Sequence, residues 1–185
     1  MVTNFSLVPK DFVIPSLKNL RREWQNITDK AFQETIVREY QYFKFLVYVL
    51  NSLHYTSEIV KNPRKISFDL RASFIKSAII SASCIMEAVL LFHAQKRNYK
   101  DLHKNEEKRT FGNIINAWKK DSNGSKEIGG QNLELLEVFL NVRNHIHISK
   151  SAKNEHVTKK LGEKEQSYLI VLDHLINFMK QITSQ

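Results

Sequence analysis

Proline and glycine, the residues that most strongly interrupt regular secondary structure, are scarce in this chain. Only three prolines occur among the 185 residues, and no glycine precedes Gly112. The stretches 16–62 and 64–111 therefore contain neither residue, and each is long enough for an extended helix. A β-protein needs frequent turn residues between short strands, so this scarcity disfavours that class.

Cysteine and the common catalytic signatures are also nearly absent. The single cysteine, Cys84, cannot form an internal disulfide. Because it falls within the apolar run 78–91, we expect a small buried residue rather than a nucleophile. The sequence contains no glycine-rich phosphate loop, no Cys/His zinc spacing and no nucleophile elbow, which excludes the enzyme classes that depend on them.

Segments typical of export or membrane insertion are missing as well. Residues 1–15 include an acid and two prolines, whereas a signal peptide has a basic start and an apolar core. Glu87 interrupts the longest apolar run, which stays below the roughly 18 uncharged residues of a membrane span. We therefore expect a cytoplasmic protein that does not contact the membrane.

Acidic residues are fewer than basic ones. The 19 Asp and Glu residues face 28 Lys and Arg residues, so the formal charge is +9 and the long-range field attracts polyanions. With 42% hydrophobic and 25% charged residues, the composition is that of an ordinary globular protein. The length suits a single domain over 1–185 that starts with an irregular segment at 1–15.

Apolar residues recur at three- and four-residue steps along most of the chain, which is the signature of helices with one buried face. The first uninterrupted stretch is expected to be helical with a kink at 26–29. Further helices are predicted at 67–96, 110–119, 131–148 and 163–182. Together these segments predict an all-α, up-and-down bundle of four to five helices.

The segments between these helices are less uniform. Thr110 precedes the third helix and is a suitable N-cap. Residues 121–130 are dense in residues that favour turns, and they are predicted to form the clearest loop of the chain. Residues 149–162 are basic and polar, and they predict no particular element.

The most informative segment is 132–148, NLELLEVFLNVRNHIHI. Its apolar stripe, formed by Leu133, Leu136 and Leu140, continues directly through Arg143 and His147. Residues four apart on a helix are neighbours, so the guanidinium and the imidazole can converge on one small anion, with Asn144 beside His147. Arginine binds phosphate oxygens bidentately, and histidine titrates near neutral pH. The segment therefore predicts a phosphate-binding pocket.

Two other interpretations of this segment are open. An Arg or His in the last turn of a helix often only caps free carbonyls and complements the helix dipole. The pair His145 and His147 also suggests a metal site, but side chains two apart on a helix diverge by about 200°, so they cannot hold one ion unless the helix has ended. We expect neither a metal nor another cofactor.

Glu87 and four lysines complete the candidate site. An unpaired carboxylate on the apolar second helix would be costly, so Glu87 is expected either to pair with Arg143 or His147 or to lie partly exposed at the rim of the bundle. The lysines that follow the motif either track an RNA backbone or form a solvated basic loop. They are Lys150, Lys153, Lys159 and Lys160.

The run Val-Arg-Asn-His-Ile-His at 142–147, near the end of a late helix in an all-α bundle, resembles the Arg-Asn…His motif of the HEPN superfamily. The acid Glu87 inside the second helix and the segment Thr-Phe-Gly-Asn-Ile-Ile at 110–115 fit that likeness, which covers about 68–178. Three residues separate Arg143 from His147, fewer than is usual in the superfamily.

The resemblance implies a function. HEPN proteins are helical bundles that commonly dimerise with their motifs facing each other, and many are metal-independent endoribonucleases of toxin–antitoxin, anti-phage and RNA-processing systems. If the roles of the family's motif apply to the matching positions, Arg143 would hold the scissile phosphate and His147 would transfer protons. Asn144 would orient the phosphate or the histidine, and Glu87 and His145 would support the site. The ribose 2′-hydroxyl would attack the adjacent phosphate and leave a cyclic phosphate end.

We therefore expect a homodimeric endoribonuclease that acts on RNA as a toxin or defence effector, with an antitoxin or another defence protein as its partner. The alternative is a non-catalytic HEPN-fold module that binds nucleic acid or protein, with the polar cluster at its dimer interface. A structural helical subunit whose charge only keeps it in solution is the third interpretation.

Overall fold

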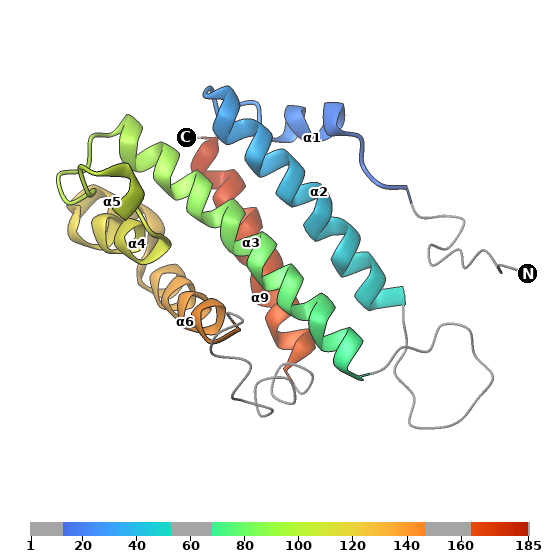
Figure 1. The fold of residues 1–185 in the computed structure, drawn as a ribbon. Helices are drawn as coiled ribbons and strands as arrows, with labels where there is room; N and C mark the ends of the chain where they lie inside the picture. Colours follow the sequence, from blue (N-terminus) through green and yellow to red (C-terminus); the bar gives the residue numbers. More distant parts are fainter. Residues whose placement is uncertain (1–12, 53–67, 147–163, 185) are drawn as a thin grey trace, which may run out of the picture.

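The computed structural model describes residues 13–52, 68–146 and 164–184, and within these ranges every regular element is helical. The prediction of an all-α bundle is confirmed (Figure 1). The α-helices are α1 (Leu17–Glu23), α2 (Lys30–Ser52), α3 (Phe68–Lys96), α4 (Phe111–Lys120), α5 (Ser122–Ile128), α6 (Gly130–Ile146) and α9 (Glu165–Thr183). A short 3₁₀ turn at Glu106–Lys108 precedes α4.

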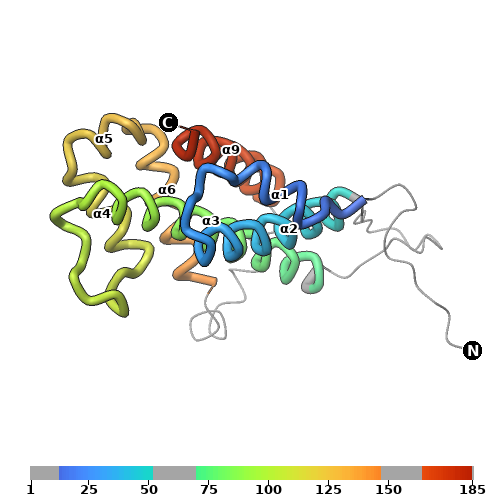
Figure 2. Tube along the Cα trace, turned by 90° about the horizontal axis from the view of Figure 1, so that it is seen from above, coloured from blue at the N-terminus to red at the C-terminus, as the bar shows by residue number. Residues whose placement is uncertain are grey.

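The helix α3 is the centre of the bundle and packs against α2, α4, α6 and α9 (Figure 1). Figures 1 and 2 both show α4 and α5 gathered at one end of the long helices, beside the C-terminal end of α3. Side chains along α3 that have no exposed surface include Ala82, Ile85, Met86, Val89 and Leu90. These residues form the middle of the hydrophobic core.

By length and composition the segment Leu70–Lys96 of α3 could cross a membrane, contrary to the expectation that Glu87 rules this out. Within the bundle, however, 61% of its most apolar window is buried by the neighbouring helices. A core helix covered on several sides has the same composition as a membrane span, which accounts for the likeness.

The predicted kink at 26–29 is a complete break between α1 and α2. Trp24 and Ile27 are buried in this break and anchor it to the core. The side chain of Asp29 then accepts hydrogen bonds from the backbone N–H groups of Ala31 at 2.8 Å and Phe32 at 3.2 Å. A carboxylate in this position satisfies the free donors of a helix start, so α2 begins as a new helix.

The loop predicted at 121–130 is wrong, because most of it forms α5. The Asp121 side chain caps this helix and accepts from the N–H groups of Asn123 at 3.0 Å and Gly124 at 2.9 Å. Gly129, with φ of 74°, ends it. Aspartate and glycine favour turns, but the same residues start and stop helices, and composition alone does not distinguish the two.

The helix α4 begins as predicted, with Thr110 accepting from the backbone N–H of Asn113. Its apolar face lies in the core, and the indole N–H of Trp118 donates to the carbonyl of Leu90 on α3 at 2.9 Å. Gly112 faces α6, where an added Cβ would lie 3.3 Å from Leu140 Cδ2. These contacts hold α4 between α3 and α6, with its start next to the predicted site.

A buried ion pair joins the start of α9 to α3. Arg71 Nε donates to Glu165 Oε2 at 2.6 Å, and Arg71 Nη2 donates to the carbonyl of Leu50 at the end of α2 at 2.9 Å. The two side chains are 14% and 8% exposed. One guanidinium therefore fixes three helices at the end of the bundle where α6 also ends (Figure 1).

Candidate functional site

The last turn of α6 carries the predicted motif. Phe139 and Ile146 are buried, whereas Leu140, predicted to lie in the buried stripe, is only partly buried. The face of α6 that packs into the core is therefore rotated slightly about the helix axis relative to the predicted apolar stripe. Arg143 consequently lies at the edge of the buried face, with 33% of its side chain exposed.

Arg143 and Glu87 form an ion pair between α6 and α3. Arg143 Nη2 lies 3.4 Å from Glu87 Oε2, and the Glu87 side chain is 25% exposed. Both expectations for Glu87 are thus met at once, since the carboxylate contacts Arg143 and also lies at the rim of the bundle. The separation exceeds the roughly 2.7–2.9 Å of a strong charge-assisted hydrogen bond, so the contact orients the guanidinium without enclosing it.

The environment of Glu87 raises the pKa of its carboxyl group. Partial burial is the main cause, because a charged form loses solvation away from water. Arg143 and the backbone N–H of Phe111, at the start of α4, oppose this effect and favour the carboxylate. Glu87 therefore lies where α3, α4 and α6 meet.

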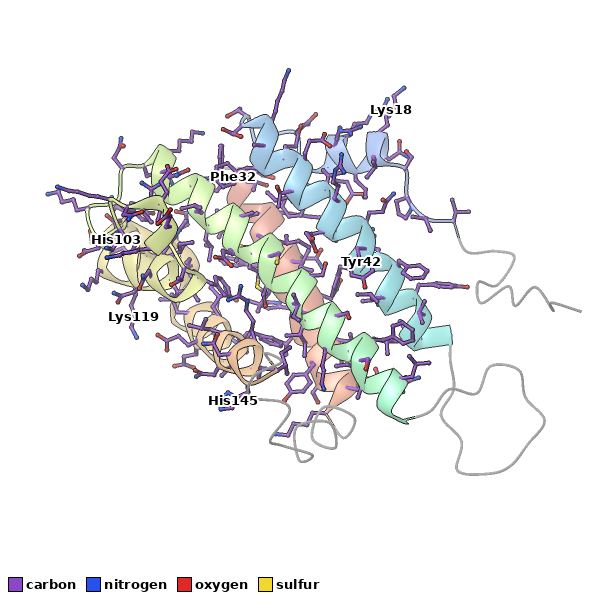
Figure 3. The ribbon with its side chains drawn as sticks, viewed as in Figure 1. Lys18, Phe32, Tyr42, His103, Lys119 and His145 are labelled. Carbon is purple, nitrogen blue, oxygen red and sulfur yellow. The ribbon has the colours of Figure 1, made fainter. Side chains whose placement is uncertain are left out.

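The neighbours of Arg143 point toward solvent. Asn144 and His145 are exposed, and Figure 3 shows His145 at the outer edge of the bundle. His145 Nδ1 lies 2.6 Å from the carbonyl oxygen of Asn141, one turn earlier in the same helix. This histidine has the position of a residue that caps the C-terminal carbonyls of a helix.

The remaining predicted residues lie outside the described part of the chain. They are His147, Lys150, Lys153, Lys159 and Lys160. The described part of α6 ends at Ile146, directly before His147. The structure thus brings Arg143, Glu87 and Asn144 to one end of α6, while the roles of the other residues stay predictions.

A groove between α2 and α3, with a volume of about 350 Å³, was not anticipated from the sequence. It is lined by Ala31, Phe32, Thr35, Cys84, Glu87, Ala88 and Leu91. Cys84, predicted to be a small buried residue, is half-buried on its wall. Burial raises the pKa of its thiol, and Glu39 and Glu87 raise it further, so the thiol is not activated as a nucleophile.

His93 is a second feature that sequence reasoning missed. Its side chain is buried on α3, and its Nε2 atom has no hydrogen-bond partner. Burial, followed by the positive charge of Arg97, lowers the pKa of His93 to about 4. The sequence offered a weak signal, since His93 follows Leu90 and Val89 at the steps of the buried face.

Within the ranges 13–52, 68–146 and 164–184, no three His, Cys, Asp or Glu side chains are grouped so that they could hold a metal ion. The chain matches no protein-family model, no curated protein and no solved structure. A function is therefore inferred from the motif at 142–147 and from the geometry around Arg143.

Proposed function

We propose that this protein is a HEPN-like, metal-independent endoribonuclease that acts on RNA as a toxin or anti-phage effector. The observation that supports the proposal most is the ion pair between Arg143 and Glu87. It holds a partly exposed guanidinium at the end of α6, beside the exposed Asn144 and four positions before His147. A homodimer that places two such motifs face to face belongs to the same proposal.

The reaction needs a cation and a group that moves protons. The ribose 2′-oxygen attacks the neighbouring phosphorus and loses its proton to a base, while the bond from phosphorus to the 5′-oxygen breaks. The 5′-oxygen takes up a proton, which leaves a 2′,3′-cyclic phosphate and a 5′-hydroxyl end. We assign the proton transfer to His147 and the hydrogen bond that orients the phosphate to Asn144.

Arg143 binds the non-bridging phosphate oxygens in this scheme. A guanidinium has five N–H donors, and Glu87 meets it through a single nitrogen at 3.4 Å. Donors thus remain for a phosphate on the exposed side of the group. Glu87 is a positioning residue, because it acts on the phosphate only through Arg143.

The charge of the chain agrees with an RNA substrate. A formal charge of +9 attracts the phosphate backbone over long distances and makes binding depend on salt. The lysines after the motif, Lys150, Lys153, Lys159 and Lys160, are proposed to extend the contact with RNA beyond the cleaved bond.

The test compares wild type with His147→Ala and Arg143→Ala on a mixed RNA pool in the presence of EDTA. A lost proton-transfer group costs about 10²–10⁴-fold in rate, which we expect of His147→Ala, and a lost electrostatic donor costs about 10²–10³-fold, which we expect of Arg143→Ala. His103→Ala is the matched control, because His103 is exposed on the α3–α4 connector, away from His145 (Figure 3).

The helical content and the oligomeric state of all four proteins are measured alongside. RNA cleavage by folded His147→Ala at the wild-type rate would refute the assignment. An absence of cleavage by folded, dimeric wild type would refute the enzymatic function and support a binding module instead.

A further inference from the structure

The groove between α2 and α3 is open to solvent and has a mostly apolar wall. Its volume of about 350 Å³ lies at the lower end of the roughly 300–1,000 Å³ range of ligand pockets. Phe32 and Ala31 come from α2, and Ala88 and Leu91 come from α3, so most of the wall is apolar. Such a wall suits the hydrocarbon part of a ligand.

Glu87 is the charged side chain among the residues that line this groove, whose other polar lining residues are Thr35 and Cys84. Glu39 is held at the α2–α3 contact, where Ser81 Oγ donates to Glu39 Oε2 at 2.8 Å. Both carboxylates raise the pKa of the Cys84 thiol while Arg143 lowers it, so this guanidinium partly offsets the acidic charge at the groove wall.

The cation that faces Glu87 from α6 leaves part of the carboxylate available. Arg143 contacts it through one nitrogen at 3.4 Å, which is not the bidentate pairing that an Arg–carboxylate pair can form. The Glu87 side chain also remains 25% exposed. A second cation could therefore approach Glu87 from the groove.

We propose that this groove binds a small organic cation, an ammonium group carried on an aromatic or aliphatic body. The ammonium pairs with Glu87, and the body lies against Phe32 and Leu91. The ligand would compete with Arg143 for the same carboxylate. This inference does not rest on the proposed ribonuclease function, because it follows from the groove and its charge alone.

Cys84 supplies the assay, because it is the only cysteine of the chain and lies on the groove wall. The rate of its alkylation by iodoacetamide reports whether the groove is filled. The two probes are N,N-dimethyl-2-phenylethylamine, which is a cation at pH 7, and N,N-dimethyl-2-phenylacetamide, which has a similar shape and no charge. We expect the amine to slow alkylation at about tenfold lower concentration than the amide, a ratio that corresponds to about 1.4 kcal/mol.

Three variants locate the effect. Glu87→Gln should reduce the protection by the amine to that of the amide, while Glu134→Gln, an exposed carboxylate on α6, should leave it unchanged. Ala31→Phe adds an aromatic side chain to the α2 wall of the groove and should reduce protection by both probes. If Glu87→Gln does not fold, Ala31→Phe still tests whether the probes bind in this groove.

Equal protection by the amine and the amide in wild type would overturn the proposal. So would full protection by the amine in folded Glu87→Gln or in Ala31→Phe. Because the assay measures thiol alkylation and uses no RNA, its outcome is independent of any ribonuclease activity.

Discussion

His93 is expected to make the stability of the protein depend on pH. Its side chain is 4% exposed, its Nε2 atom has no hydrogen-bond partner, and its pKa is lowered to about 4. The unfolded chain has the ordinary value of about 6.5. Between these two values the unfolded state binds a proton that the folded state does not, so stability falls as the pH falls from 6.5 toward 4.

The size of the effect follows from the two pKa values. They lie about 2.5 pH units apart, and each unit corresponds to about 1.36 kcal/mol, so His93 costs the fold about 3 kcal/mol at pH 4 relative to pH 7. His93→Leu removes the titrating group and leaves no hydrogen bond broken at Nε2. Other groups titrate in both proteins, so the difference between them isolates His93.

The assay is urea unfolding of wild type and His93→Leu at several pH values between 7 and 4. We expect wild type to lose about 3 kcal/mol more than the variant over this range. Similar stability of the two proteins at pH 7 is part of the prediction. A parallel pH dependence of the two proteins would refute the argument that His93 is kept neutral by burial.

Two further predictions concern packing. Glu165→Gln should cost about 3–5 kcal/mol in chemical unfolding, because it removes the negative charge that pairs with the nearly buried guanidinium of Arg71. Glu137→Gln, which removes an exposed pair, should cost less than about 1 kcal/mol. Equal losses of unfolding free energy in the two variants would contradict the role of the Arg71–Glu165 ion pair in holding α9. Gly124→Ala should lower the free energy of unfolding by about 1–3 kcal/mol, because its Cβ would lie 2.8 Å from the Tyr99 hydroxyl. An unchanged melting temperature would show that the Tyr99 side chain moves aside without a loss of stability.

Much of the fold could be predicted from the sequence because the signals were local. The scarcity of proline and glycine and the three- and four-residue spacing of apolar residues indicated both ends of α3 and α9 and the start of α6 to within about two residues, the usual uncertainty of helix limits. The Thr110 cap of α4 was also found from local chemistry.

The errors arose where one residue type serves two purposes. Asp121 and Gly129 suggested a loop, but they are the start and the end of α5. The break between α1 and α2 is wider than the predicted kink, because buried Trp24 and Ile27 hold the chain between two helices. Burial of this kind is set by tertiary packing, which spacing alone does not reveal.

The site was partly predictable for a physical reason. An unpaired carboxylate on an apolar helix is costly, so the sequence predicts that Glu87 either pairs with Arg143 or His147 or lies partly exposed at the rim, and the structure pairs it with Arg143 at 3.4 Å. The groove beside Glu87 depends on how α2 packs on α3, and no pattern within either helix indicates it. His93 escaped notice because the sequence does not show that its ring lacks a hydrogen-bond partner.

The most direct test of the central claim is the chemistry of the RNA ends. Wild-type protein is incubated in EDTA with one RNA pool and with the same pool carrying 2′-O-methyl groups, and the products are mapped. We predict cleavage of the unmodified pool only, with 2′,3′-cyclic phosphate and 5′-hydroxyl ends. Cleavage of the methylated pool, or products with 5′-phosphate ends, would contradict attack by the 2′-oxygen and with it the roles assigned to Arg143 and His147.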